Sequence, residues 1–237
     1  MSILILTTNT IHHSYYVREI LKKYPEVVIF CETKKIQNPF KNNNHKFDID
    51  IEKYEIKEWF NNKNIALKDF KKIYNFNNLN SEKAIKKINS FKPNLIISFG
   101  IGKLTKHTLK NISNNIYNLH GGNPEKYRGL DSYLWGIYHN DFKNIMVSLH
   151  KLDTKLDSGR IFLNKKININ LYTKIYHIRK LITEATIILS LKLIKQSLGG
   201  KKILLKKQIN KSRYYSVMPL SLKNIIFKKY KHYINKI

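Results

Sequence analysis

The hydrophobic positions of the chain include three short apolar runs. Ile3 to Leu6, Val27 to Cys31 and Leu95 to Ser98 are each bounded by polar or turn-forming residues. Strands that are covered on both faces of a parallel sheet read as continuous apolar runs, without the alternation of a half-exposed strand. We therefore predict a buried strand at each of these positions.

Segments with helical character lie between these runs. His13 to Lys23 follows the first run, and Ser81 to Ser90 precedes the third. Ser81 stands where an N-cap is favoured, and Pro93 stops the helix just before the strand. Strands and helices therefore alternate along the first hundred residues.

The stretch 33–72 has a less regular pattern. Residues 37–44 are rich in asparagine and contain a proline, which favours a surface loop. A helix is expected after this loop, near Ile51 to Phe60.

The second half of the chain predicts further elements of both kinds. Asn115 to Leu119 resembles a fourth strand, and Ile145 to Leu152 alternates apolar and polar residues as a strand does. Helical spacing extends over Asp131 to Tyr138 and over Tyr172 to Leu198, where Gly199-Gly200 ends the helix.

This order of elements predicts an α/β fold with a Rossmann-like, open and mainly parallel sheet. The 237 residues suffice for one large domain with a small appendage. We expect residues 1–198 to form the main domain. Residues 199–237 would form a C-terminal appendage of short strands and a final lysine-rich helix.

Cysteine content and hydropathy favour the cytoplasm. The single cysteine, Cys31, allows neither a disulfide within the chain nor a cysteine zinc cluster. No apolar run approaches the roughly 18 residues that a membrane span needs, and Met1 to Leu6 lacks the features of a signal peptide. We expect a cytoplasmic protein with no membrane span.

The charge of the chain is strongly positive, with 44 Lys and Arg against 16 Asp and Glu and a formal net charge of +28. Such a balance often indicates a nucleic-acid partner. Here most of the excess positive charge is lysine, and it is dispersed along the chain. Ile, Asn and Tyr are also abundant, a composition that the coding bias of an AT-rich genome can produce. We therefore expect small anionic ligands and keep nucleic-acid binding as the alternative.

Two common nucleotide-binding motifs are missing. The first predicted strand leads into Thr7 to His13, which contains no glycine for a G-x-G-x-x-G turn. The Gly-Lys pairs at 102–103 and 200–201 are followed by Leu104 and Lys202, where a P-loop requires Ser or Thr. These absences argue against NAD-linked and NTP-hydrolysing functions.

Polar side chains follow the predicted strand at Asn115 to Leu119. Asn118 and His120 alternate along this strand and therefore point to the same side, toward the crevice where open α/β sheets bind ligands. Further on, Asp153 and Asp157 lie in a turn after the alternating strand. A carboxylate near His120 would orient the ring and stabilise its protonated form.

These groups suit acyl transfer. Asn118 can donate a hydrogen bond to an oxyanion, His120 can transfer protons, and Asp157 can set the charge state of the histidine. Structural roles remain open: Asn118 can cap a turn, Asp157 can form an Asx turn, and His120 can be a core histidine.

A metal site is not expected. His12, His13, His139 and His150 could in principle combine with Asp153 or Asp157, but their spacing matches no known ligand pattern.

The order and spacing of these segments resemble the formyltransferases that use 10-formyltetrahydrofolate, over roughly residues 75–165. This family includes methionyl-tRNA, glycinamide ribonucleotide and nucleotide-sugar N-formyltransferases. Members carry Asn-x-His at a strand end, then a proline, Tyr/Trp-Arg-Gly, a helix, and Leu-Asp-Thr/Ser-Gly. The corresponding residues here are Asn118, His120, Pro124, Arg128-Gly129 and Leu156 to Gly159.

The resemblance implies a formyltransferase with 10-formyltetrahydrofolate as the formyl donor. It makes Asn118, His120 and Asp157 the catalytic residues, with no metal, and residues 1–198 the catalytic domain. The donor would lie against a second set of residues, Ser98, Phe99, Gly100, Ile101 and Asp153.

Two departures bear on the acceptor. After the histidine, many members have Ser-Leu-Leu-Pro, whereas this chain has Gly122-Asn123-Pro124. The glycine-rich phosphate loop of glycinamide ribonucleotide transformylases is also replaced, by Thr7 to His13.

The end of the chain favours a small acceptor. Methionyl-tRNA formyltransferases continue into a C-terminal barrel, whereas 37 residues follow Gly200. Ser212 to Pro219 resembles the tail of formyltransferases associated with surface-polysaccharide sugars. We expect a nucleotide-linked amino-deoxysugar as acceptor, with tRNA formylation or a non-catalytic nucleic-acid-binding protein as alternatives. The sequence leaves the oligomeric state open, a homodimer included.

Overall fold

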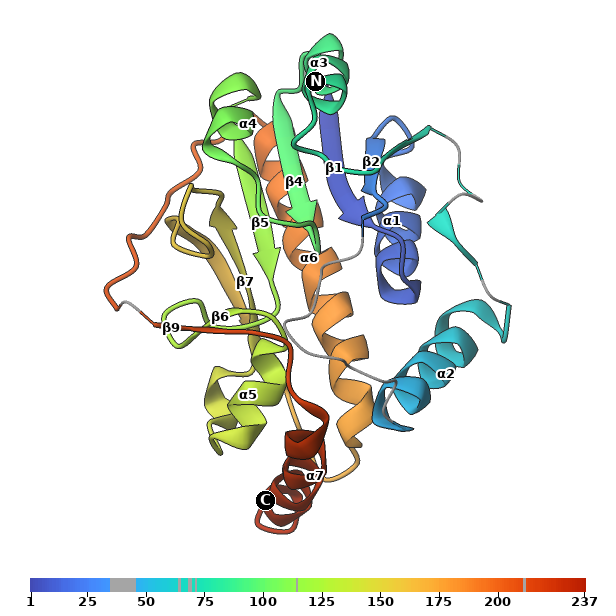
Figure 1. The fold of residues 1–237 in the computed structure, drawn as a ribbon, viewed down its shortest axis with the longest axis vertical. Coiled ribbons are helices and arrows are strands. Elements are labelled where there is room, and N and C mark those ends of the chain that lie inside the picture. The colour runs from blue at the N-terminus through green and yellow to red at the C-terminus, as the bar shows by residue number, and fades with distance from the viewer. Residues whose placement is uncertain (35–45, 64, 68–69, 71, 114, 211) are drawn as a thin grey trace.

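A seven-stranded sheet forms the centre of the computed structural model (Figure 1). The structure describes residues 1–34, 46–63, 65–67, 70, 72–113, 115–210 and 212–237. The strand order is β3-β2-β1-β4-β5-β7-β8. The strands are β1 (Ile3–Thr8), β2 (Val28–Glu32), β3 (Ile73–Phe76), β4 (Leu95–Phe99), β5 (Ile116–His120), β7 (Met146–Lys151) and β8 (Ile161–Lys166).

Five neighbouring strands of this sheet are parallel. β3, β2, β1, β4 and β5 run in one direction, whereas β7 pairs antiparallel with β5, and β8 antiparallel with β7. The predicted α/β fold with an open, mainly parallel sheet is therefore confirmed. The three apolar runs of the sequence form β1, β2 and β4 at its centre.

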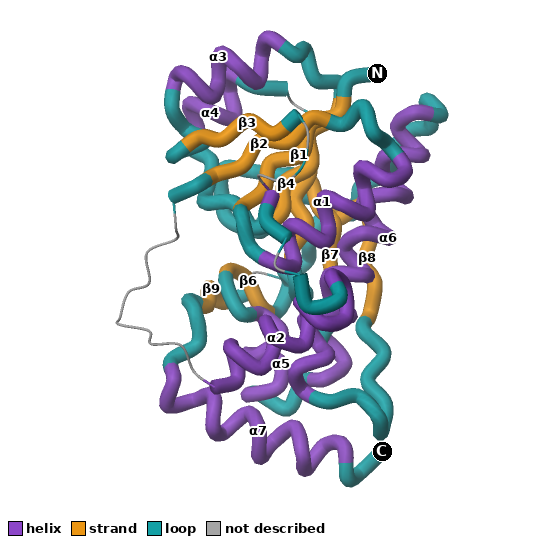
Figure 2. Tube along the Cα trace, turned by 90° about the vertical axis from the view of Figure 1, so that its right-hand side faces the viewer, coloured by secondary structure: helices purple, strands orange, loops and turns teal. Residues whose placement is uncertain are grey.

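Helices cover both faces of the sheet (Figure 2). α1 and α6 pack against one face, and α3 and α4 against the other. α2, α5 and α7 lie beyond the carboxyl ends of the parallel strands (Figure 1). The helices are α1 (Ile11–Lys23), α2 (Lys46–Phe60), α3 (Glu82–Ser90), α4 (Lys106–Asn111), α5 (Ser132–Tyr138), α6 (Ile178–Leu198) and α7 (Leu220–Ile234), with short 3-10 turns η2 (Phe142–Asn144) and η3 (Ile175–His177).

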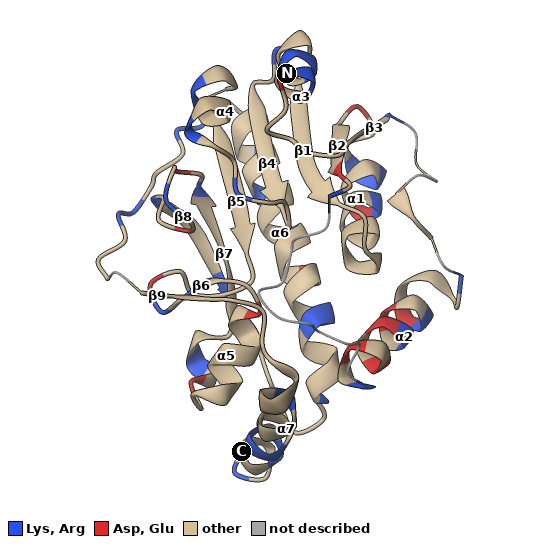
Figure 3. Ribbon diagram, viewed as in Figure 1, with Lys and Arg blue, Asp and Glu red and all other residues tan. Residues whose placement is uncertain are grey.

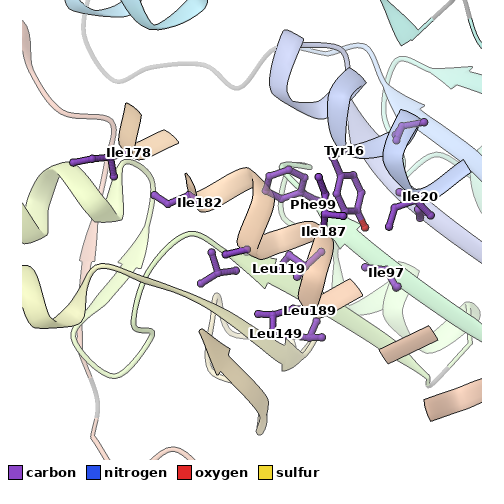
Figure 4. Close-up of a cluster of buried hydrophobic side chains, with 14 of the residues drawn as sticks. Tyr16, Ile20, Ile97, Phe99, Leu119, Leu149, Ile178, Ile182, Ile187 and Leu189 are labelled. Atoms are coloured by element: carbon purple, nitrogen blue, oxygen red, sulfur yellow. The ribbon is translucent and has the colours of Figure 1, made fainter. Parts of the chain in front are cut away.

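The central strands are apolar over most of their length because each face of the sheet has its own core. Ile5 and Ile97 belong to the larger cluster, which lies on the side of α1 and α6. Figure 4 shows Ile97 and Tyr16 among the side chains of this cluster. Leu4 and Ile96 point the opposite way, toward α3. Burying both faces in this way removes a large apolar area from water and stabilises the sheet.

The sequence prediction placed no strand at three positions that form one, and it expected short strands within residues 199–237 without giving their bounds. β3 and β8 are the two edges of the main sheet, and their sequences carry Asn or Lys where one side meets water. Two more short strands, β6 (Tyr127–Gly129) and β9 (Arg213–Tyr215), pair in parallel as a separate two-stranded sheet. Segments of three or four residues give too little periodicity to be recognised.

Two helix boundaries also differ from the prediction. The long helix expected from Tyr172 begins at Ile178, because Asn170 and Thr173 form a side-chain-bonded turn before it. α2 begins at Lys46, five residues before the predicted start. The predicted loop at 37–44 lies outside the described residues. α6 ends at the expected glycine, Gly199.

The C-terminal segment runs back across the carboxyl ends of the strands. Lys206 forms a bridge with Ile161, β9 pairs with β6, and α7 packs against α5. The buried ammonium of Lys223 on α7 lies 2.6 Å from the carboxylate of Asp48 on α2. Residues 199–237 therefore contact the rest of the chain at several points.

Lysine and arginine side chains are distributed over many elements. Figure 3 shows them on α1, α3, α4, α6 and α7 and on the segment between α6 and β9, whereas α2 carries a group of acidic residues. Among the residues that the structure describes, no helix combines the length and apolar character of a membrane span.

Candidate active site

A cavity of about 880 Å³ opens at the carboxyl ends of the parallel strands. Its wall contains residues from the ends of β1, β4 and β5, from the turn after β7, and from α5 and α6. This edge is where open α/β sheets bind ligands, because the loops that follow the strands converge there.

Asn118, His120 and Asp157 meet at this cavity, as the sequence predicted. The Asn118 amide donates a hydrogen bond to Asp157 Oδ1 at 3.3 Å. His120 Nδ1 lies 3.5 Å from Asp157 Oδ2. The side chains of His120 and Asp157 are both buried. An amide, an imidazole and a carboxylate thus form one contiguous group.

The hydrogen bonds of Asn118 fix the orientation of its amide. Ser98 Oγ donates to Asn118 Oδ1 at 2.9 Å, so the NH₂ group must face the opposite way, toward Asp157 and His150. Both of those bonds are 3.3 Å long, which is at the weak end of the range. Either bond can be exchanged for one to a substrate oxygen.

The environment of His120 determines its tautomer. Nε2 lies 2.7 Å from the carbonyl oxygen of Tyr127, and a carbonyl can only accept, so Nε2 carries the hydrogen. Burial lowers the pKa of His120 below its ordinary value, although Asp157 opposes this shift. The ring is therefore neutral at neutral pH, with the lone pair of Nδ1 toward Asp157. A base with its other nitrogen fixed in this way suits proton transfer.

Asp157 is held as an anion. Burial disfavours its charge, but the positive charge that His120 and His150 carry when protonated, together with the N–H of Gly129, outweighs burial and keeps the pKa of the carboxyl well below its ordinary value. Gly129 donates its backbone N–H to Asp157 Oδ2 at 2.9 Å. The carboxylate thus contacts β5 and the Arg128-Gly129 segment. An Asx turn, the alternative role for Asp157, would instead bond the carboxylate to the backbone of its own turn.

His150 is a member of this group that the sequence did not assign. It lies opposite Asn118 where β7 pairs with β5, and its Nε2 is 3.4 Å from Asp157 Oδ1. Its Nδ1 is 2.9 Å from the carbonyl oxygen of Lys151, which makes Nδ1 the donor. The alternation of Ile145 to Leu152 predicted this strand, but not its position beside β5.

Four of the five residues expected at the donor line the cavity. Phe99, Gly100, Ile101 and Asp153 are on its wall. Ser98 is fully buried beside Asn118, where it supports the amide without lining the cavity.

Gly100 has no space for a side chain. It has φ +76, and a Cβ added there would lie 2.0 Å from Nε2 of His13. This glycine lets the loop after β4 pass directly over the imidazole of His13 at the first turn of α1.

The stability of the protein should depend on pH through His13. Burial, with a smaller effect of Arg179, lowers the pKa of His13 to about 3. Below the unfolded pKa of about 6.5, the unfolded chain therefore binds a proton that the folded protein does not. We expect His13→Gln to reduce the fall in unfolding free energy between pH 6 and 4 by about 1.4 kcal/mol per pH unit. Chemical denaturation at several pH values in this range measures the unfolding free energy of both proteins. The same dependence of that free energy on pH in both proteins would contradict the prediction.

Buried polar residues fix the loops around the cavity. Glu32 accepts the backbone N–H of Leu79 and of Gly102, the latter at 2.7 Å, and so holds the loop after β4. On the opposite wall, Arg179 of α6 forms two hydrogen bonds with the buried carboxylate of Glu55. Neither pair was found from the sequence, because each joins elements far apart in the chain.

No cluster of three or more His, Cys, Asp or Glu in the described part of the chain is placed to hold a metal ion. The histidines at the site instead contact Asp157, Asn118, backbone carbonyls and the hydroxyls of Thr8 and Thr10.

Comparisons with known proteins relate the chain to formyl-transferring enzymes. Over 123 residues it is 32% identical to the bifunctional polymyxin resistance protein ArnA of Wigglesworthia glossinidia brevipalpis; this covers 48% of the chain and 19% of ArnA, so the chain spans about a fifth of that protein.

Two solved structures share the fold. A sugar N-formyltransferase from a Shewanella species superposes with a TM-score of 0.61 at 14% identity, over 92% of this chain and 77% of that one. The formyltransferase PseJ from Anoxybacillus kamchatkensis superposes with a TM-score of 0.57 at 15% identity, over 96% of this chain and 90% of that one.

The family model for formyl transferases matches residues 15–186, which is well over half of the chain and includes Asn118, His120 and Asp157. The chain therefore belongs to the formyl transferase family.

Proposed function

We propose that the protein transfers a formyl group from 10-formyltetrahydrofolate to the amino group of a nucleotide-linked amino-deoxysugar. The observation that carries the proposal is the buried group of Asn118, His120 and Asp157 on the wall of a cavity at the strand ends. The similarity to PseJ, whose structure contains UDP-4,6-dideoxy-4-formamido-L-AltNAc and tetrahydrofolate, supports this choice of donor and acceptor.

The reaction begins when the neutral amine attacks the formyl carbon of the donor. A carbon–nitrogen bond forms, the carbonyl oxygen becomes an oxyanion, and the amine nitrogen becomes positively charged. The amide of Asn118 would turn one of its two long hydrogen bonds toward the oxyanion. One such donor contributes roughly 3–4 kcal/mol in comparable sites.

Proton transfer would go through His120. Its Nδ1 lone pair takes the proton from the amine, and the resulting imidazolium is stabilised by Asp157 at 3.5 Å. When the intermediate collapses, the bond between the formyl carbon and N10 breaks, and the imidazolium returns the proton to N10. The products are the formamide and tetrahydrofolate, and His120 is again neutral.

The donor and acceptor would occupy different parts of the cavity. Phe99, Gly100, Ile101 and Asp153 form the wall that we assign to the folate. The acceptor would enter past Tyr214, whose ring is largely exposed at the cavity.

Residues 1–198 would form the catalytic domain, with 199–237 as an appendage. A homodimer remains a separate proposal, testable by sedimentation.

The acceptor can be tested against tRNA by salt dependence. A nucleotide sugar carries about two negative charges, whereas a tRNA that contacts six or more phosphates loses orders of magnitude in affinity between roughly 50 and 200 mM salt. We expect tetrahydrofolate release with a panel of amino-sugar nucleotides, and only a mild rise in KM over this salt range. Methionyl-tRNA should be neither substrate nor potent inhibitor; potent competitive inhibition by tRNA would refute the sugar acceptor.

A further inference from the structure

We propose that Gln208, in the C-terminal segment, is a positioning residue that holds the turn carrying Asp157 in its reactive geometry. The inference rests on the proposed catalytic role of Asp157. Gln208 itself would not touch the reacting atoms, since its contacts are to the backbone of the turn and to Arg128.

The amide of Gln208 joins two segments of the site. Its Nε2 donates to the carbonyl oxygens of Asp157 and Gly159, each at 2.8 Å. Its Oε1 accepts from Nη2 of Arg128 at 3.0 Å. Both hydrogens of the NH₂ group and the carbonyl oxygen are thus used, so the amide has one orientation that satisfies all three bonds.

The turn at Asp157 needs such support. Asp157 has φ 49, in the left-handed region, which costs a non-glycine residue about 1–2 kcal/mol. Strained backbone persists where the surrounding structure holds it in place. Gln208 bonds the carbonyls on both sides of Ser158, and so supports the turn from Asp157 to Gly159.

The backbone on both sides of Gln208 is itself fixed. Lys206 exchanges two hydrogen bonds of 2.7 Å with Ile161, and Glu125 accepts the N–H of Ile209 at 2.6 Å. Arg128 is held in addition by its bond to the Pro124 carbonyl. Gln208 is therefore anchored at its own backbone and at its partner.

This arrangement has a consequence for catalysis. Gly129 donates its N–H to Asp157 Oδ2, and the neighbouring Arg128 bonds Gln208, which bonds the backbone of Asp157. The position of Asp157 is thus fixed by one hydrogen bond to its carboxylate and by another to its main-chain carbonyl. Loss of the main-chain support should move Asp157 relative to His120 while both residues stay in the protein.

Gln208→Glu tests this role with little change in shape. The carboxylate keeps an acceptor for Arg128, but it replaces the NH₂ group with an oxygen that faces two carbonyl oxygens. We expect kcat to fall at least about tenfold with both KM values within about twofold, because binding surfaces are unchanged. The acid limb of the kcat profile should move to lower pH, since a displaced Asp157 stabilises the His120 imidazolium less.

Gln196→Glu is the matched control. Gln196 also donates its side-chain amide to a backbone carbonyl, that of Lys202, but it lies at the exposed end of α6. The kcat and the pH profile of the Gln196→Glu variant should equal those of the unmodified protein. Thermal unfolding of both variants checks that they fold, and Gln208→Met, which removes the amide without adding charge, replaces Gln208→Glu if the latter unfolds.

A double-mutant cycle with Asp157→Asn separates the outcomes. If Gln208 acts through Asp157, Gln208→Glu causes no further loss in the Asp157→Asn background. A tenfold further loss in that background, or unchanged kcat in the single Gln208→Glu variant, would overturn the positioning role. Normal turnover of Asp157→Asn alone would instead refute the proposed mechanism.

Discussion

Asp157→Asn should lower turnover at least about a hundredfold while the protein remains folded. The substitution keeps the size of the side chain, and its oxygen can still accept from Asn118 or Gly129. What it removes is the negative charge beside His120 Nδ1. The imidazolium formed during the reaction is then buried without a counter-charge, and a hundredfold loss corresponds to about 2.7 kcal/mol of transition-state stabilisation.

Steady-state and single-turnover formylation, with circular dichroism as a check of folding, measure this effect. Asp153→Asn provides the contrast, because Asp153 lies in the same turn but bonds mainly with Thr154. We expect that variant to change the KM of the donor more than turnover. Turnover of Asp157→Asn within threefold of the unmodified protein would exclude a catalytic charge at this position.

Gly159→Ala should abolish activity and lower the melting temperature. A Cβ at Gly159 would lie 1.6 Å from the carbonyl oxygen of Lys151 and 2.7 Å from its carbonyl carbon. These are backbone atoms of β7, so the clash is relieved only if the turn moves away from the strand. That movement breaks the bond from Gln208 to Gly159 and displaces Asp157.

We expect a loss of turnover of at least about a thousandfold, on the scale of removing a catalytic group. Overpacking of about 2–3 kcal/mol should lower the melting temperature by roughly 4–12 °C in a chain of this size. Gly200→Ala is the control: Gly200 has φ +64 but no atom within 4 Å of an added Cβ. It should lose a little stability and keep full turnover. Normal activity of Gly159→Ala would show that the turn does not need its position against β7.

The core of the fold could be predicted because its signals are local. Continuous apolar runs mark β1, β2 and β4, and the positions of Asn118 and His120 two residues apart place them on one side of β5. The helical segments between the runs then require a parallel sheet, whose carboxyl ends locate the cavity.

The remainder of the site depends on pairings between distant segments. His150 joins Asn118 only because β7 lies antiparallel beside β5 in one register, and alternation along a strand does not reveal its neighbour. Ser98 was expected on the donor wall, but the register of β4 and β5 places it directly beside Asn118. Gln208 reaches Asp157 across 51 residues of sequence, with no periodic pattern that would indicate the contact.

Formyl transfer by the Asn118–His120–Asp157 group is the activity that the geometry of the cavity supports. The most direct measurement is a single-turnover reaction of excess protein with 10-formyltetrahydrofolate and an amino-sugar nucleotide, following tetrahydrofolate by absorbance and the formamide by mass spectrometry. The unmodified protein should yield one formamide per tetrahydrofolate released, and His120→Ala should slow this step at least about a hundredfold without losing donor binding. Equal rates for His120→Ala and the unmodified protein would contradict the assignment of this group as the catalytic centre.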